Sequence, residues 1–403
     1  MDRTLTDRNL FNVVGNDYTR LAFTQNFWAD ILLSQFDMDL DVHLPCDAYS
    51  EADHALFQPA DLRGDRAMAY YVFQDFLNLR THDPHPFPGS LFISSAELSQ
   101  ALTTDRVGIS PEYPRGLPTV YDFTYENADV FSGVDNLARS LASESSPYLG
   151  YFHFWSPHGP YNARREFVGI FEDDLKWHSK SRHPFAQGDF PQEHMREKHR
   201  EYDECVAEVD AEFGRVISDL EKSGVLQNSY VIVTSDHGEL FERGEIGHAS
   251  ALMYAPVTHV PLLISAPGQA TRSDFHSLTS IEDILPTILQ ITGREIPDWV
   301  EGRLLPGFGG TEDAARVIFP IVAKDNATFQ SIEKATFTMI KGPYELLFFT
   351  GYKNHEDRFE LYNLQEDPDE LQDLFSKDIN TASQMKDELL EAVNAANRNY
   401  QKK

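Results

Sequence analysis

The chain has 403 residues, of which 41% are hydrophobic and 12% aromatic, a composition typical of a globular protein with a large buried core. Its formal charge of −30, from 64 acidic and 34 basic residues, argues against binding to nucleic acid or to anionic lipid. Its two cysteines, Cys46 and Cys205, exclude a disulfide framework and a cysteine-rich zinc site.

No run of the sequence approaches the roughly 20 apolar residues that span a membrane, and the first residues lack the apolar segment of a signal peptide. We therefore expect a soluble, cytoplasmic protein that does not bind membranes. The acidity fits a salt-adapted protein and an ordinary acidic cytosolic protein equally well. The sequence leaves the oligomeric state open.

The first third of the chain contains few regular patterns. Residues 1–100 predict helices and short strands, and the apolar-periodic stretch 27–36 is the clearest helix among them. Segment 103–125 is rich in Pro and Gly and predicts a loop on the surface. The apolar run 149–154 then predicts a strand.

An α/β pattern follows. Apolar residues recur at helical spacing over 202–220, which predicts a helix, and Gly224 is expected to end it. The β-branched run 230–234 predicts a strand buried on both faces of a parallel sheet, and 260–265 predicts a third strand. A helix over 281–291 completes the alternation, which indicates an α/β fold: a mostly parallel sheet sandwiched by helices.

The last part of the chain has a different sequence pattern, in which short strand-like runs follow one another. Residues 317–322, 335–340 and 344–350 predict a small antiparallel sheet, and a polar helix over 381–400 closes the chain. We therefore expect an α/β catalytic domain over 1–310 and a small α+β subdomain over 311–403.

The side chains that carry chemistry follow the predicted strands. In an open parallel sheet, ligands bind beyond the carboxyl ends of the strands, and Asp236 and His237 directly follow the strand 230–234. A carboxylate and an imidazole are suitable ligands for a divalent cation. His158 follows the strand 149–154, and His248 follows His237 after a short loop, so both are expected to surround an anion held by the metal. A bare Asp-His-Gly tripeptide is otherwise typical of a helix cap.

Several motifs together resemble the sulfatase family of the alkaline-phosphatase superfamily. The motif Ser-Asp-His-Gly-Glu over 235–239, the Gly-His pair at 247–248 and the strand 260–264 carry the resemblance. So do 283–289 and the tail 360–370, whereas 16–23 is similar more loosely. The match runs in register from about residue 145 to 375 and implies an alkaline-phosphatase-like fold.

The resemblance also implies roles for particular residues. Asp236 and His237 correspond to metal ligands, with calcium as the usual ion in sulfatases. His158 and His248 correspond to catalytic residues that contact the sulfate ester, and His248 stands where many relatives carry a lysine. Asn26 falls near another substrate-contacting position.

The chain departs from the family pattern at the nucleophile. Sulfatases make formylglycine from the Cys or Ser of Cys/Ser-x-Pro-x-Arg, which neither Cys46 nor Cys205 nor any serine fits. The family also places this nucleophile and a pair of metal-binding aspartates ahead of the segment that begins here near Asn16. Because two ligands rarely hold a hard cation that takes six to eight oxygens, we expect an N-terminally incomplete chain that binds metal weakly and hydrolyses sulfate esters negligibly on its own.

Three functions stay open. The first is a metal-dependent hydrolase of small-molecule or glycan sulfate esters. The second is a phosphoester or phosphonate hydrolase, or a phosphoglycerol transferase, on the same fold. The third is a non-catalytic pseudoenzyme that binds an anion or a glycan.

Overall fold

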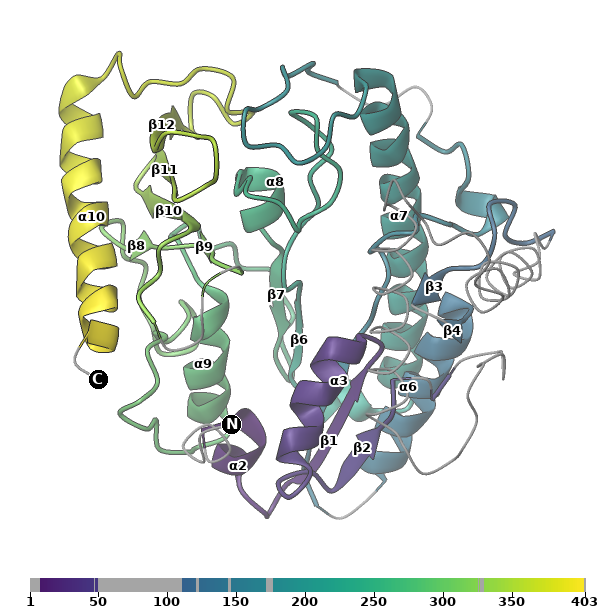
Figure 1. Ribbon diagram of the computed structural model, residues 1–403. Helices are drawn as coiled ribbons and strands as arrows, with labels where there is room; N and C mark the ends of the chain where they lie inside the picture. Colours follow the sequence, from purple (N-terminus) through teal and green to yellow (C-terminus); the bar gives the residue numbers. More distant parts are fainter. Residues whose placement is uncertain are drawn as a thin grey trace, which may run out of the picture. The chain divides into compact units, whose positions relative to one another are not determined.

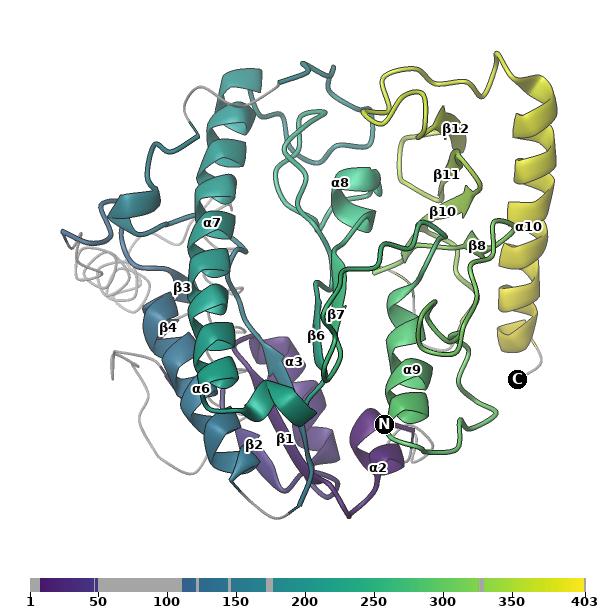
Figure 2. The same ribbon diagram turned by 180° about the vertical axis from the view of Figure 1, so that it is seen from behind.

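The computed structural model describes residues 8–46, 48–49, 111–120, 123–143, 146–171, 177–324, 326 and 330–401 (Figures 1 and 2). The chain forms two compact units. The first unit comprises residues 1–175 and 200–229, and the second unit comprises residues 176–199 and 230–403. The subdomain boundary expected at residue 310 stays a prediction.

The first unit is built on a parallel sheet. Strand β1 (Thr19–Thr24) lies in the middle, between β2 (Val42–Leu44) and β5 (Tyr148–His153), and both neighbours run parallel to it. The register pairs Thr24 with His153, so β1 and β5 end side by side. The predicted parallel sheet and the predicted strand at 149–154 are thereby confirmed.

Helices of the first unit pack around this sheet. Helix α3 (Phe27–Leu33) continues as a 3-10 turn to Phe36, in agreement with the helix predicted over 27–36. Phe131 of α6 (Asn127–Ala142) stacks on Phe154, directly after β5, with ring centroids 4.3 Å apart. The same apolar cluster includes the buried Val216.

Two further parts of the first unit complete its description. Helix α2 (Leu10–Val14) precedes β1, and strands β3 (Thr119–Val120) and β4 (Phe123–Thr124) form a short hairpin inside the segment predicted as a loop. The beginning of that segment, residues 103–110, lies outside the described residues.

Helix α7 (Gln192–Lys222) is longer than the predicted helix 202–220 and contributes residues to both units. Gly224 follows it in the left-handed conformation, with φ at 81°, where a glycine is favoured because it lacks Cβ. The predicted end of the helix is thus confirmed.

In the second unit, strand β6 (Val231–Thr234) pairs with β7 (Leu262–Ser265) in antiparallel orientation. The alternation of strands and helices predicted a parallel pair here, and that prediction is wrong. The last residue of β6, Thr234, pairs with the first residue of β7, Leu262. The connection between the two strands therefore begins and ends at the same end of the pair. Only the short helix α8 (Ala255–Thr258) interrupts this connection, whereas a parallel pair needs a crossover to the opposite end.

The C-terminal part of the second unit agrees with the prediction. Helix α9 (Ile284–Ile291) matches the helix predicted over 281–291. An antiparallel five-stranded sheet follows, in which β12, β11, β10 and β8 are successive neighbours and β9 also pairs with β10. Its strands are β8 (Val317–Ile318), β9 (Ile321–Val322), β10 (Ala335–Lys341), β11 (Tyr344–Thr350) and β12 (Arg358–Asn363).

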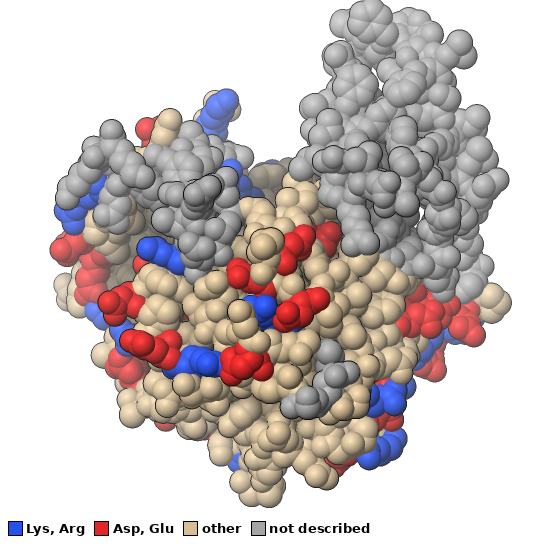
Figure 3. Space-filling view, turned by 90° about the horizontal axis from the view of Figure 1, so that it is seen from below, with Lys and Arg blue, Asp and Glu red and all other residues tan. Residues whose placement is uncertain are grey.

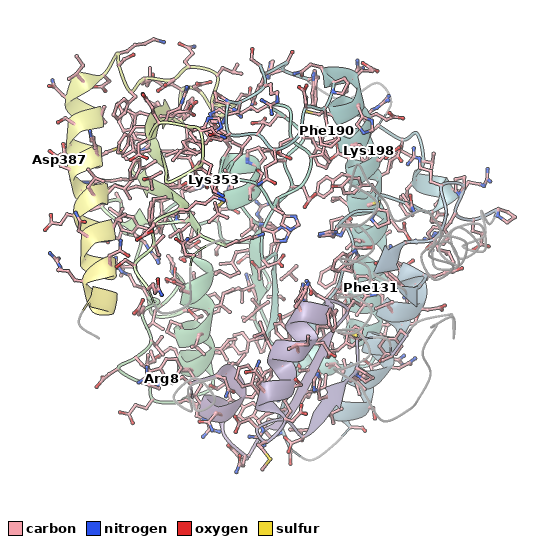
Figure 4. All side chains as sticks on the ribbon, in the orientation of Figure 1. Arg8, Phe131, Phe190, Lys198, Lys353 and Asp387 are labelled. Carbon is pink, nitrogen blue, oxygen red and sulfur yellow. The ribbon has the colours of Figure 1, made fainter. Side chains whose placement is uncertain are left out.

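Helix α10 (Ile379–Gln401) packs against this sheet through one apolar face. Ala382, Met385 and Leu389 recur at helical spacing and belong to the same buried cluster as the sheet residues Phe337 and Leu346. Asp387 lies on the exposed face of the helix (Figure 4).

None of the helices in the described ranges has both the length and the apolar character of a membrane span. Where Figure 3 draws described residues, acidic and basic side chains are interspersed rather than separated by sign. The described part of this face therefore presents no broad basic surface to a polyanion.

Candidate functional site

Asp236 and His237 lie where the sequence predicts them, directly after β6. The turn that carries them packs closely on α8, because the amide of Gly238 donates a 2.9 Å hydrogen bond to the carbonyl of Val257. A Cβ atom at Gly238 would overlap the carbonyl oxygen of Pro256. Only glycine fits this approach, which explains its place after the Asp-His pair.

His237 presents one particular nitrogen. Its Nδ1 lies 2.9 Å from the carbonyl oxygen of Gly238, and because a carbonyl only accepts, Nδ1 carries the proton and Nε2 carries the lone pair. Nε2 lies 3.6 Å from Oδ2 of Asp236. The side chains of Asp236 and His237 are 56% and 30% exposed, respectively, and so remain accessible to an ion.

This pair fits a divalent cation. Ligand atoms about 2.1 to 2.5 Å from one ion, at right angles to each other, lie roughly 3 to 3.5 Å apart, close to the separation of Nε2 and Oδ2. An imidazole with its proton fixed on Nδ1 is the tautomer that offers Nε2 to a metal. The donor set of Asp236 and His237 therefore suits a metal.

His248 belongs to the same cluster in the second unit. Its imidazole stacks on that of His237, with ring centroids 3.6 Å apart. Its Nδ1 contacts a carboxylate oxygen of Glu239, whose side chain is 5% exposed. The structure thus brings together Asp236, His237 and His248, as the sequence predicts, and adds Glu239, the last residue of the Ser-Asp-His-Gly-Glu motif.

His158 lies in the first unit, beyond the end of β5. Its Nδ1 is 2.8 Å from the carbonyl oxygen of Gly159, so Nε2 carries the lone pair here too. Its ring packs on that of Trp155 at a centroid distance of 4.1 Å. The amide of Trp155 donates to the side-chain oxygen of Gln25 at 2.9 Å, which ties this loop to the end of β1.

The loop that follows His158 is anchored on α7. The buried Glu208 accepts a 2.9 Å hydrogen bond from the amide of Arg164 and a 3.0 Å hydrogen bond from the hydroxyl of Tyr113. A buried carboxylate needs such partners, because its loss of hydration is otherwise uncompensated. The loop position is therefore set by the interior of the first unit.

Asn26 has a structural role that the resemblance did not indicate. It is the N-cap of α3, and its side-chain oxygen accepts from the amides of Trp28 at 2.9 Å and Ala29 at 3.3 Å. Asn26 and His158 follow the adjacent parallel strands β1 and β5. A role of Asn26 in substrate binding stays a prediction.

A buried carboxylate, Glu360, stabilises the segment that precedes α8, on which the turn after β6 packs. Glu360 accepts hydrogen bonds from Nε2 of His183 at 2.9 Å and from the hydroxyls of Tyr254 at 2.6 Å and Tyr362 at 2.9 Å. Burial alone raises the pKa of Glu360, but His183, the hydroxyl of Tyr254 and the charge of Arg358 lower it to about 2. Tyr254 directly precedes α8, so this network holds the helix on which the turn after β6 rests.

A second buried carboxyl lies on β11. Glu345 is fully buried, and it lies beside Glu370, which accepts a 3.1 Å hydrogen bond from the amide of Ala255 in α8. Burial, and then the neighbouring carboxylate of Glu370, raise the pKa of Glu345 well above its ordinary value, so the neutral form of Glu345 is favoured in the folded chain.

Two family models match this chain. One, described as "Sulfatase", matches residues 100–294, and the other, described as "N-sulphoglucosamine sulphohydrolase, C-terminal", matches residues 244–397. The cluster of Asp236, His237 and Glu239 lies within the first match, and His248 lies within both.

Curated relatives and a solved structure show the same similarity. The chain is 29% identical to arylsulfatase K of Bos taurus over 212 residues, which cover 51% of this chain and 38% of that protein. It is 26% identical to choline-sulfatase of Rhizobium meliloti (strain 1021) over 259 residues, 58% of this chain and 49% of that protein. The chain thus spans less than half the length of these two relatives.

Among solved structures, phosphonate monoester hydrolase of Silicibacter pomeroyi superposes with a TM-score of 0.59 at 18% identity. The superposition covers 96% of this chain and 80% of that chain. This likeness concerns the fold, and it confirms the predicted alkaline-phosphatase-like architecture.

Proposed function

Because the chain belongs to the sulfatase family of the alkaline-phosphatase superfamily, we propose that its second unit carries part of a metal-dependent site for the hydrolysis of sulfate esters. The observation that carries this proposal is the pair of Asp236 and His237 at the end of β6, with Nε2 and Oδ2 3.6 Å apart. A divalent cation held there supplies positive charge against the oxygens of the ester.

The protein's own residues have separate tasks in this proposal. Asp236 and His237 hold the cation, and calcium is the ion we expect. The place of His248 beside the sulfate group rests on the family resemblance. Because its Nδ1 faces Glu239, a hydrogen bond from His248 to a sulfate oxygen also requires a proton on Nε2. The same role for His158 of the first unit rests on the family resemblance and stays a prediction.

The proposal stops before the covalent step. No residue of the 403 lies in a Cys/Ser-x-Pro-x-Arg motif, so the chain has no position where formylglycine would be made. We therefore propose binding and orientation of a sulfate ester for these residues. We expect weak metal binding and negligible turnover by this chain alone, as two side-chain ligands imply.

The substrate class follows from the names of the matches. Choline-sulfatase is named for a small-molecule sulfate ester, and N-sulphoglucosamine sulphohydrolase is named for a sulfated sugar. We propose a small-molecule or glycan sulfate ester for this chain. The cytoplasmic location and the domain boundary at residue 310 stay predictions beside it.

The test is binding of inorganic sulfate and of an aryl sulfate in the presence of calcium, followed through the imidazole ¹⁵N resonances of the chain. We expect both ligands to shift the resonances of His237 and His248, and His248→Ala to weaken binding. The exposed His276 provides the control, since His276→Ala removes an imidazole from a different loop.

The outcomes separate the alternatives. Resonances that stay unchanged with both sulfate ligands would contradict the proposal. Tighter binding of a phosphonate monoester than of the aryl sulfate would favour phosphonate chemistry on the same fold. Measurable turnover of the aryl sulfate would support the hydrolase and contradict the expectation of negligible activity.

A further inference from the structure

We propose that Ser235 is a positioning residue, whose hydroxyl fixes the turn after β6 so that Oδ2 of Asp236 and Nε2 of His237 face the same cation. The cation in this statement rests on the proposed function. The turn itself does not, because the hydrogen bonds that form it lie within residues 235–238 and in their contact with α8.

The peptide group between His237 and Gly238 is held at both of its polar ends. The hydroxyl of Ser235 donates a 2.5 Å hydrogen bond to the carbonyl oxygen of His237. The amide of Gly238 donates a 2.9 Å hydrogen bond to the carbonyl oxygen of Val257, at the other end of the same group. Because a trans peptide group is planar, with its C=O and N–H pointing in opposite directions, the two contacts together define its orientation.

The hydrogen bond from Ser235 constrains both proposed ligand residues. It closes a ring of atoms that runs through the backbone of Asp236 and His237, so the φ and ψ angles of both residues are restricted together. Serine and aspartate side chains commonly form local hydrogen bonds of this kind to the backbone of a turn. The geometry of the ligand pair therefore depends on a neighbouring hydroxyl as well as on the cation.

Two further contacts turn the ligand atoms toward each other. The amide of His237 donates to Oδ1 of Asp236 at 3.0 Å, and Oδ2 lies 3.6 Å from Nε2 of His237. Nδ1 of His237 donates to the carbonyl oxygen of Gly238 at 2.9 Å, so the lone pair is on Nε2, the nitrogen that binds a cation. Both contacts use backbone groups of the turn, so both depend on the dihedral angles that the Ser235 hydroxyl restricts.

The neighbouring hydroxyl of Thr234 provides a matched control. Its shorter hydrogen bond, of 2.9 Å, goes to the carbonyl oxygen of Pro261, directly before β7. It therefore joins β6 to β7 rather than closing the turn. Thr234→Val keeps the branched side chain of this exposed residue and removes the hydroxyl, so it reports the general cost of losing a hydroxyl at the end of β6.

The first experiment reads the turn in the absence of added metal, through the imidazole ¹⁵N signals of His237, which the His237→Gln variant assigns. We expect the Nδ1–H form of His237 in the wild type, in Ser235→Thr, which keeps the hydroxyl, and in Thr234→Val. We expect Ser235→Ala to give a mixture of the Nδ1–H and Nε2–H forms, because the carbonyl of Gly238 is no longer held beside the ring.

The second experiment measures the affinity of each variant for calcium in an NMR titration. We expect Ser235→Ala to weaken calcium binding by about tenfold, a typical effect of removing a side chain that orients a metal ligand. Ser235→Thr should restore most of the affinity, and Thr234→Val should leave it unchanged.

Three outcomes would overturn the proposal. They are an unchanged calcium affinity in Ser235→Ala, an equal loss of affinity in Ser235→Ala and Thr234→Val, and a loss that Ser235→Thr does not restore. A wild type that binds no calcium but keeps the Nδ1–H form of His237, with that form lost in Ser235→Ala, would instead contradict the proposed function. The role of Ser235 in the turn would stand in that case.

Discussion

The imidazole rings of His237 and His248 are stacked, with centroids 3.6 Å apart and planes 23° from parallel. In the proposed function, His237 holds the cation and His248 lies beside the ester, so the two proposed roles depend on side chains that pack against each other. A substitution of either histidine therefore moves the other, and their effects on binding should not be additive.

Calcium binding tests the assignment of the ligands. Asp236→Asn removes the charge opposite Nε2 of His237, and we expect it to reduce calcium affinity by at least about tenfold in a calorimetric titration. The wild-type dissociation constant should be weaker than micromolar, because two side chains fill only part of the coordination sphere. Asp274→Asn is the control, since Asp274 is exposed and pairs with Arg272. Micromolar affinity in the wild type, or unchanged affinity in Asp236→Asn, would contradict the assignment.

Because of Glu345, we expect the folded chain to lose stability as pH rises. Its pKa is raised well above 4.5 in the folded chain, so folding takes up a proton between the unfolded and the folded pKa. Stability is present at low pH and is lost as pH rises, by up to about 1.4 kcal/mol per pH unit. Glu345→Gln stays neutral, and its stability relative to the wild type should rise between pH 5 and pH 8 in urea unfolding.

The exposed Glu356 provides the control for this prediction, and Glu356→Gln should follow the wild type at every pH. A Glu345→Gln variant whose stability difference from the wild type is the same at pH 5 and pH 8 would show that the carboxyl is not protonated on folding.

Because of Glu360, we expect the folded chain to lose stability as pH falls. Its pKa is about 2 in the folded chain and 4.5 in the unfolded chain, so it contributes stability above pH 4.5, which is lost as pH falls through 2. We expect Glu360→Gln to lower the free energy of unfolding at pH 7 by about 3 kcal/mol. The difference should shrink on acidification in a series of urea titrations, and a difference that grows toward pH 3 would contradict the assignment.

His43 links α3 to β2 through two carboxylates. Its Nε2 lies 2.9 Å from Asp30 and its Nδ1 lies 2.7 Å from Asp37. The hydrogen bond to Asp30, opposed by burial and aided by Asp37, raises the pKa of His43 above 6.5. The stability that this group contributes is present below pH 6.5 and is lost as pH rises through the folded pKa.

An NMR titration of the His43 imidazole checks this prediction. We expect its midpoint to lie above 6.5, and we expect His43→Gln to be destabilising at pH 6 but less so at pH 9. A midpoint at or below 6.5 would contradict the stabilisation of the charged imidazole by Asp30 and Asp37.

The sequence predicted the elements whose apolar residues are periodic. Helices 27–36 and 281–291 were located within a few residues, because burial on one face imposes a period on the side chains. The strand 149–154 was located from its continuous apolar run. The antiparallel orientation of β6 and β7 was not predicted, because a β-branched run is typical of parallel and of antiparallel strands alike. The cap role of Asn26 was detectable, since an Asn directly before a predicted helix is a typical N-cap.

The candidate site was predicted in part. Asp236, His237 and His248 were found through strand ends and a family motif, and the structure brings them together. Glu239 was not assigned a partner, because its proximity to His248 depends on two backbone hydrogen bonds between Leu240 and Gly247. Backbone pairing of this kind leaves no periodic trace in the side chains.

Leu240 and Gly247 form an antiparallel bridge, and the residues that it encloses belong to the interior of the second unit. Phe241, Arg243 and Glu245 are 4%, 5% and 7% exposed, and the guanidinium of Arg243 lies over the ring of Tyr254. The segment between Glu239 and His248 is therefore part of the core rather than a surface loop. A change of its length would disturb the packing of the second unit together with the two side chains that flank it.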